Sequence, residues 1–209
     1  MKFRASIWAS LLLVLPSCGC DTAHSVNPFY FQENITVDPS LVGEWQDSNP
    51  SNIGTLRVSP LSPDSYSFVL MVRDQETERR TTTEFEAHIF RFHNETYVDI
   101  LPRKFQINGK NEKYVSTEDD LEFYAPVHTA MRMVRDKDSL SFLFNADFDA
   151  SSLFKKEDEQ AKKAREEELY RRRIAVLTMS TEQLQQQVLP ALPTDQSSAS
   201  LSLTYRRTK

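Results

Sequence analysis

The chain has 209 residues, 39% of them hydrophobic, a formal net charge of −5 and only two cysteines, Cys18 and Cys20. The rest of the chain therefore has neither a disulfide nor a thiolate zinc site, and an apolar core must hold the fold together. The acidic balance argues against partners that bind through phosphate groups, such as nucleic acid or anionic lipid headgroups.

The first 17 residues have the layout of a secretory signal peptide. Lys2 and Arg4 precede an apolar run from Ile7 to Leu15, and small residues follow that run. The run is far shorter than the roughly 20 residues with which a helix crosses a bilayer, so we expect its removal. Taking Lys2 and Arg4 from the 25 basic residues leaves 23 against 30 acidic ones, a charge of −7 for the mature chain.

Leu15-Pro16-Ser17-Cys18 resembles the lipobox of bacterial lipoproteins, with leucine three positions before the cysteine and a small residue directly before it. Proline within the box departs from that pattern. The resemblance implies that acyl chains such as palmitate on Cys18 attach the protein to a membrane of the cell envelope, and stable anchoring requires more than one chain. Ordinary signal cleavage without a lipid is the alternative.

Cys20 is the alternative acceptor, because the small residue Gly19 precedes it. The choice changes the expected location of the protein. In the sorting rule of enterobacterial lipoproteins, an aspartate directly after the lipidated cysteine retains the protein in the inner membrane. Lipid on Cys20 would place Asp21 at that position and imply the inner membrane, whereas lipid on Cys18 places Gly19 there and permits the outer membrane.

Residues 18–40 form the expected lipidated N-terminus and tether. They mix polar residues with Pro28 and Pro39 and show no sustained period, which is typical of a linker. Three consecutive aromatic residues, Phe29 to Phe31, are expected to order it locally. The remaining residues, 41–209, suit one domain that buries roughly 70% of its unfolded surface.

From Leu41 onward, apolar and polar residues alternate strictly, as they do when one face of an antiparallel strand is buried. The alternation predicts seven strands before residue 150, over residues 43–46, 55–59, 66–72, 85–89, 96–101, 127–133 and 140–148. Turn residues lie at 49–50, 62–64, 93–95 and 136–138. Short neighbouring strands favour a meander closed into a barrel or folded into a sandwich, because closure removes exposed edges.

Residues 154–173 interrupt this pattern and predict a charged helix. Glu159 and Lys163, like Glu168 and Arg172, are opposite charges four residues apart, the spacing that supports a helix face. A solvated helix is the plain interpretation, and a helix that binds a protein partner is the alternative. Residues 174–179 return to a strand-like composition.

A second, short helix is expected at about residues 181–190. Ser180 and Gln183 have the spacing of a capping box, and Pro190 would limit the helix at its C-terminal end. Leu184, Val188 and Leu189 would form its buried stripe. Beyond a Pro, Asp and Ser-rich loop, alternation from residue 201 to residue 206 predicts a final strand.

Leu41-Val42-Gly43-Glu44-Trp45 resembles the Gly-x-Trp signature that opens the first strand of lipocalin-like, calycin-type barrels. The resemblance implies that Gly43 permits a sharp bend, that Trp45 plugs one end of the barrel and that Arg206 or Arg207 stacks on the indole. A plain core aromatic is the alternative for Trp45. The chain has no Thr-Asp-Tyr-like second motif near Asp136, and the charged helix also departs from the family.

The resemblance covers about residues 41–207. It implies a mainly β fold, an antiparallel up-and-down barrel with one charged helix and one short C-terminal helix. An eight-stranded barrel of this kind is either packed solid or holds one small ligand.

Catalysis needs a prearranged group whose protonation can be tuned, and the chain offers none at a recognisable spacing, so we expect no enzyme and no cofactor. His88 falls on the polar face of its strand beside Glu84 and Glu86, and is expected to be exposed to solvent. His128 faces away from the methionine side of its strand, and His93 lies in a turn. No third ligand accompanies His88 and His93 at zinc-like spacing, so no metal site is expected.

Two functions from different classes remain. The first is a binding module, a barrel that accepts a small apolar ligand or lipid. Its interior would be lined by one aromatic and methionine set: Trp45, Tyr66, Phe68, Phe85, Met131, Met133, Phe142 and Phe144. In the second, these residues fill a solid core, and a structural or assembly lipoprotein binds a protein partner through the charged helix or an outer sheet face. The sequence identifies neither the ligand nor the partner.

Overall fold

The computed structural model describes residues 23–48, 53–73, 80–108, 113–115, 127–144, 176–199 and 201–208. The two expected lipidation sites, Cys18 and Cys20, lie outside these ranges, as does the expected charged helix at residues 154–173.

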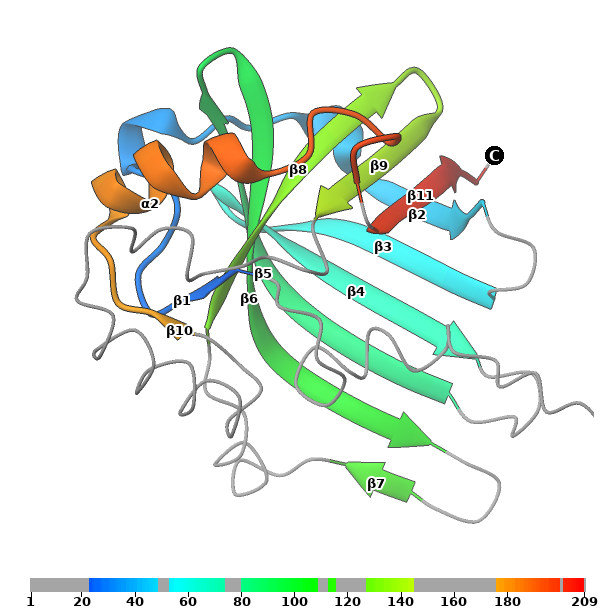
Figure 1. Cartoon of the computed structure of the whole chain (residues 1–209). Helices are drawn as coiled ribbons and strands as arrows, with labels where there is room; N and C mark the ends of the chain where they lie inside the picture. Colours follow the sequence, from blue (N-terminus) through cyan, green and yellow to red (C-terminus); the bar gives the residue numbers. More distant parts are fainter. Residues whose placement is uncertain are drawn as a thin grey trace, which may run out of the picture.

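Eight antiparallel strands form a closed barrel, as the sequence predicts (Figure 1). They are β2 (Gly43–Asp47), β3 (Ile53–Ser62), β4 (Ser65–Arg73), β5 (Arg80–Phe92), β6 (Glu95–Asn108), β8 (His128–Asp136), β9 (Ser139–Phe144) and β11 (Leu201–Arg207). Each strand pairs with the next in chain order, and β11 pairs with β2 to close the ring. A three-residue strand, β7 (Lys113–Val115), lies beside the end of β6.

The barrel has two different ends. At one of them, which we call the cap end, lie the hairpin turns β3–β4, β5–β6 and β8–β9, the start of β2 and the end of β11. We call the opposite end of the barrel the mouth. In the β5–β6 turn, His93 and Asn94 have φ angles of 47° and 67°. Positive φ at both central residues is what a tight two-residue hairpin requires, so the predicted turn at residues 93–95 is confirmed.

The first hydrophobic cluster lies inside the barrel. Its members occupy alternate positions along each strand, because successive residues of a strand point to opposite faces of the sheet. The cluster contains Leu41, Trp45, Leu56, Val58, Tyr66, Phe68, Leu70, Phe85, Ala87, Ile89, Val98, Ile100, Met131, Met133, Leu140, Phe142, Phe144 and Tyr205.

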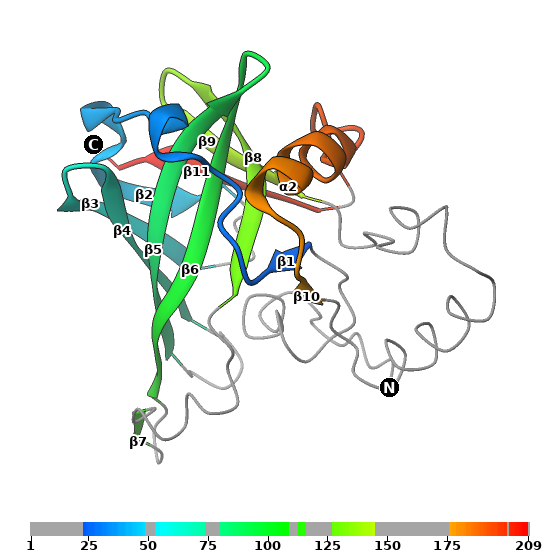
Figure 2. The same ribbon diagram turned by 90° about the vertical axis from the view of Figure 1, so that its left-hand side faces the viewer.

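The second hydrophobic cluster lies on the outer face of β5, β6 and β8, where the N-terminal segment and a short helix cover the sheet (Figure 2). The helix, α2 (Thr181–Gln187), begins at the capping box of Ser180 and Gln183 and is followed by the 3-10 turn η5 (Leu189–Ala191). Leu184, Val188 and Leu189 are all buried in this cluster, so the predicted helix and its apolar stripe are confirmed.

The N-terminal segment is packed along the barrel from residue 23 onward. β1 (His24–Ser25) pairs with β8 on one side and with β10 (Val176–Leu177) on the other. The chain then makes the 3-10 turns η1 (Gln32–Asn34) and η2 (Pro39–Leu41), and η2 leads into β2 at the cap end. The part of the expected tether that the structure describes is therefore attached to the folded domain along its length.

Candidate functional site: the barrel interior and its cap

Trp45 closes the cap end. Its side chain is fully buried, and its indole Nε1 donates a hydrogen bond to the Leu41 carbonyl oxygen at 2.9 Å. Leu41 is the last residue of η2, the 3-10 turn that Asp38 caps directly before β2. This turn places the Leu41 carbonyl at the end of the barrel. The indole ring thus closes this end of the barrel, and its only polar group, the N–H, is hydrogen-bonded.

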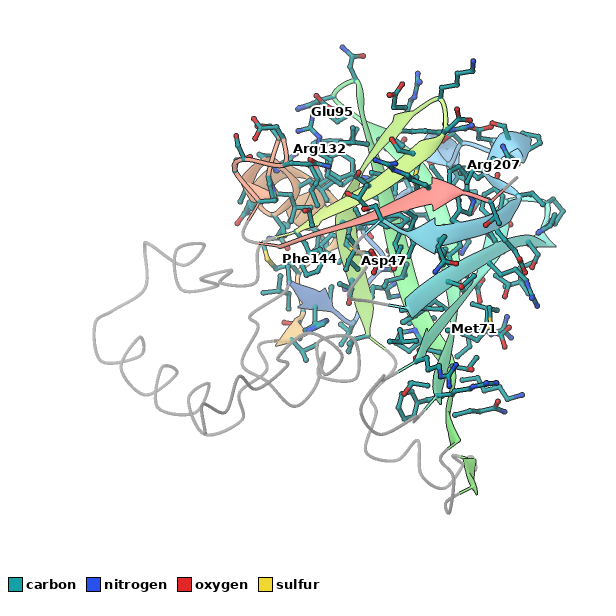
Figure 3. All side chains as sticks on the ribbon, turned by 90° about the vertical axis from the view of Figure 1, so that its right-hand side faces the viewer. Asp47, Met71, Glu95, Arg132, Phe144 and Arg207 are labelled. Atoms are coloured by element: carbon teal, nitrogen blue, oxygen red, sulfur yellow. The ribbon has the colours of Figure 1, made fainter. Side chains whose placement is uncertain are left out.

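Arg207 covers the outside of the indole. It lies at the end of β11 (Figure 3). It pairs directly with Trp45 across β11 and β2, and its guanidinium carbon lies 5.4 Å from the centroid of the indole ring. The same guanidinium donates to the carbonyl oxygens of Val42 at 2.8 Å and Ser40 at 3.2 Å. The sequence leaves Arg206 and Arg207 as alternatives, and the pairing register assigns this role to Arg207.

Gly43 makes room for this arginine. Its φ of 145° is a backbone conformation that side-chain-bearing residues rarely adopt. A Cβ at this position would also lie only 3.3 Å from Nη2 of Arg207. The glycine of the Gly-x-Trp motif therefore serves both the bend of the chain and the approach of the guanidinium.

A second group of polar contacts fastens the segment that leads into η2. The Asp38 backbone N–H donates to the Tyr66 hydroxyl at 2.7 Å, and the Asp38 carboxylate accepts from Arg135 and from Ser40. Partial burial opposes ionisation of Asp38, but the hydrogen bonds from Ser40 and the charge of Arg135 outweigh it and lower the pKa of this carboxyl. The cap is thereby held from two sides of the barrel.

All eight predicted lining residues lie in the interior cluster. Their side chains come from β2, β4, β5, β8 and β9, and neighbouring rings contact one another. Phe142 is central, with its ring centroid 6.1 Å from that of Phe68 and 6.1 Å from that of Tyr205. The residual exposure is zero for Leu41 and Trp45 at the cap but 9% for Met131 and 8% for Met133.

The interior also contains polar side chains that the sequence interpretation missed. Asp47 follows Trp45 by two residues on β2, and it pairs across the sheet with Tyr205 of β11. Burial and, to a lesser extent, the negative charge of Asp47 raise the pKa of the Tyr205 hydroxyl. Alternation from Trp45 would have placed Asp47 inside, but the predicted strand ends one residue too early, at Gln46.

The histidines lie on or beside the outer face of the sheet. His128 faces away from the barrel interior, as predicted, and its Nδ1 lies 3.0 Å from a carboxylate oxygen of Asp99. The prediction that His88 is exposed to solvent is wrong. Only 12% of its side chain is exposed, because Tyr30 of the N-terminal segment stacks on its ring at 4.4 Å between centroids.

Asp99 fixes the N-terminal segment to this face. It is almost completely buried, and it accepts a hydrogen bond from the Phe29 backbone N–H at 2.8 Å in addition to its contact with His128. Burial raises the pKa of this carboxyl although both hydrogen-bond partners favour the charged form. The cluster has an evident structural role in docking residues 23–31.

His24 makes the docking of this segment sensitive to acid. It is buried in β1, its Nδ1 lies 2.8 Å from the Thr129 hydroxyl, and burial lowers its pKa from 6.5 to about 4. The unfolded chain binds a proton near pH 6.5, whereas the folded chain does so only near pH 4. The stability that neutral His24 contributes is therefore complete above pH 6.5 and is lost as the pH falls from 6.5 to 4.

We expect the free energy of unfolding to fall by at most about 3 kcal/mol across this window through His24 alone. His24→Gln, which cannot be protonated, should make the pH dependence shallower between these limits. Urea unfolding of both proteins above and below the window measures the difference. The same slope in both would contradict the role of this histidine.

The described part of the chain contains no group of three or more His, Cys, Asp or Glu side chains that could hold a metal ion. Within that same part, no helix is long and apolar enough to cross a membrane.

A functional conclusion for this protein rests on the geometry of the structure, because the comparisons with known proteins supply no relative. The closed antiparallel barrel with eight strands is shown by its strand pairing alone. Comparison of the chain with models of protein families, with curated proteins and with solved structures finds no match.

Proposed function

We propose that this protein is a membrane-anchored, non-catalytic lipoprotein of the cell envelope whose lipocalin-like barrel binds a small apolar ligand or lipid. The anchor in this proposal is acylated Cys18, with Cys20 as the alternative. Membrane attachment depends on acyl chains here, because the mature chain is acidic and does not adhere to anionic headgroups by charge.

The observation that supports ligand binding is a difference in residual exposure among the inward-facing side chains. The cap is completely shut by Leu41 and Trp45, whereas the inward-facing methionines of β8 keep 8–9% of their surface exposed. Apolar walls with one sealed end and few polar groups are the usual composition of sites for apolar ligands. Methionine suits such a wall, because its unbranched side chain adapts to different ligand shapes.

Native mass spectrometry of the protein, extracted from membranes in a mild detergent, tests this proposal. We expect an intact mass that includes the acyl chains on the N-terminal cysteine, and a stoichiometric apolar adduct that organic extraction releases for identification. A mass without acyl chains overturns the anchoring. A chain that carries no adduct, and takes none up from fatty acids, fatty alcohols and phospholipids, overturns ligand binding and favours a structural protein with a solid core.

A pair of neighbouring substitutions separates a site inside the barrel from binding elsewhere. Met133→Trp adds bulk to the interior and should lower the fraction of ligand-bound protein at least tenfold, at a cost of about 1–3 kcal/mol in stability from overpacking. Val134→Trp adds a ring at the next residue, which is 42% exposed and faces outward, and should leave the adduct in place. Equal adducts in both variants would contradict a site in the barrel.

A further inference from the structure

The chain is fixed to the barrel a few residues after its expected anchor. Ala23 is 2% exposed within the second hydrophobic cluster, and His24 and Ser25 form β1. The Ser25 hydroxyl donates to the Leu177 carbonyl oxygen at 3.2 Å, and the Val26 N–H donates to the same oxygen at 3.1 Å. The point at which the anchored end of the chain meets the barrel is therefore well defined.

This point lies at the mouth of the barrel. Thr129, the second residue of β8, pairs with Ile100 of β6 on one side and with His24 on the other. β1 is therefore on the β9 side of β8, and it lies beyond β9, whose pairing with β8 reaches only to Arg132. Figure 2 shows β1 and β10 toward the lower end of β8, away from the hairpins of the cap end.

The length of chain between the anchor and β1 limits which end of the barrel can face the membrane. The five steps from Cys18 to Ala23 span at most about 18 Å when fully extended, and the three steps from Cys20 span about 11 Å. Along β8, the seven steps from Thr129 to Asp136 at the cap end cover about 23 Å. The cap could approach the bilayer only with the whole stretch drawn out along the barrel, whereas the mouth lies beside the point of attachment.

The surface at this point, residues 23–27 and 176–179, is uncharged and partly apolar, and we call it the anchor rim. It contains no Asp, Glu, Lys or Arg, although 26% of the chain is charged. Val26, directly after β1, is 52% exposed, and Val176 of β10 is 40% exposed. Exposed apolar side chains without charged neighbours in the rim suit shallow contact with a neutral lipid surface.

We propose that the mouth of the barrel faces the bilayer that holds the acyl chains, with Val26 and Val176 in contact with zwitterionic lipid and the Trp45 cap turned away. This inference rests on the proposed anchoring through Cys18 or Cys20 and adds the orientation of the barrel to it. The bilayer is then the nearest source of an apolar ligand, and it lies at the end of the barrel that the cap does not close.

Tryptophan fluorescence in brominated vesicles tests this orientation, because bromine on lipid acyl chains quenches tryptophans that lie close to the chains. Val26→Trp and Leu61→Trp are made separately in the full-length protein, extracted in mild detergent and incorporated into phosphatidylcholine vesicles with or without bromine. Leu61 is a matched control, since it is 38% exposed and lies beside the β3–β4 turn of the cap end. The buried Trp45 adds the same background to both variants.

We expect bromine to remove roughly half or more of the fluorescence that Val26→Trp adds, and little of the fluorescence that Leu61→Trp adds. Val176→Trp places a ring at a second position on the anchor rim and should behave as Val26→Trp does, so a folding defect in one variant does not decide the result. Equal quenching at the rim and at Leu61→Trp, or stronger quenching at Leu61→Trp, overturns the orientation.

Flotation of the vesicles separates this inference from the anchoring on which it rests. Protein that floats with the vesicles, but whose two rim variants are unaffected by bromine, keeps its anchor and overturns the contact with lipid, which leaves the rim to a protein partner. Protein that does not float with the vesicles overturns the proposed anchoring, and the orientation with it.

Discussion

Trp45→Ala should lower the free energy of unfolding by about 3–5 kcal/mol, the range for removal of a large, completely buried aromatic side chain. Trp45 has no exposed surface, and its loss would leave a cavity at the cap and an unpaired Leu41 carbonyl. Urea unfolding followed by circular dichroism measures the change, because the substitution removes the tryptophan whose fluorescence would report on the barrel. The expected effect is global, since the ring contacts the interior cluster that joins all the strands of the barrel.

Two controls test the assignment of this energy to the cap. Trp45→Phe keeps a ring in the cluster but loses the hydrogen bond to Leu41, so it should cost clearly less than the alanine variant. Arg207→Ala removes the covering guanidinium and should cost about 1 kcal/mol, whereas Arg206→Ala on the exposed face should cost less than half of that. Equal effects of the two arginine variants would contradict the stacking of Arg207 on the cap.

The barrel itself could be predicted because its strands carry a simple pattern. On β4, Tyr66, Phe68 and Leu70 alternate with polar or half-exposed neighbours. This period of two indicates a strand in a sheet with one buried face. The two-residue turn at His93 and Asn94 was also visible from its composition. Local sequence determines features of this kind, and the structure confirms them.

Register and long-range contacts could not be predicted in the same way. A shift of one residue between β11 and β2 would exchange Arg206 and Arg207, and nothing local in the sequence fixes that shift. The exposure of His88 depends on Tyr30, which reaches it from a segment with no period of its own. Asp47 is a different case, because the alternation that predicts Trp45 would have revealed it with one more residue of strand.

The N-terminal segment shows how a stretch without a pattern can still be firmly held. The Phe29 side chain is completely buried, its N–H donates to Asp99 of β6, and its carbonyl oxygen accepts from Gln185 of α2 at 3.0 Å. One residue thereby joins the segment, the sheet and the helix. The partners lie 70 and 156 residues away along the chain, which is why neither spacing nor composition predicts them.

Phe29→Ala should therefore destabilise the packing of the N-terminal segment and α2 on the sheet, but not the barrel itself. We expect the free energy of local opening to fall by about 3–5 kcal/mol for residues 23–41 and for α2, because a fully buried phenylalanine is lost from the cluster that holds both. Hydrogen–deuterium exchange should show faster exchange in these two stretches, while amides of β3 and β4 keep their protection. Phe31→Ala, two residues away at a side chain that is 37% exposed, should change exchange little. Loss of protection throughout β3 and β4 in Phe29→Ala would instead show that the outer layer and the barrel unfold as one unit.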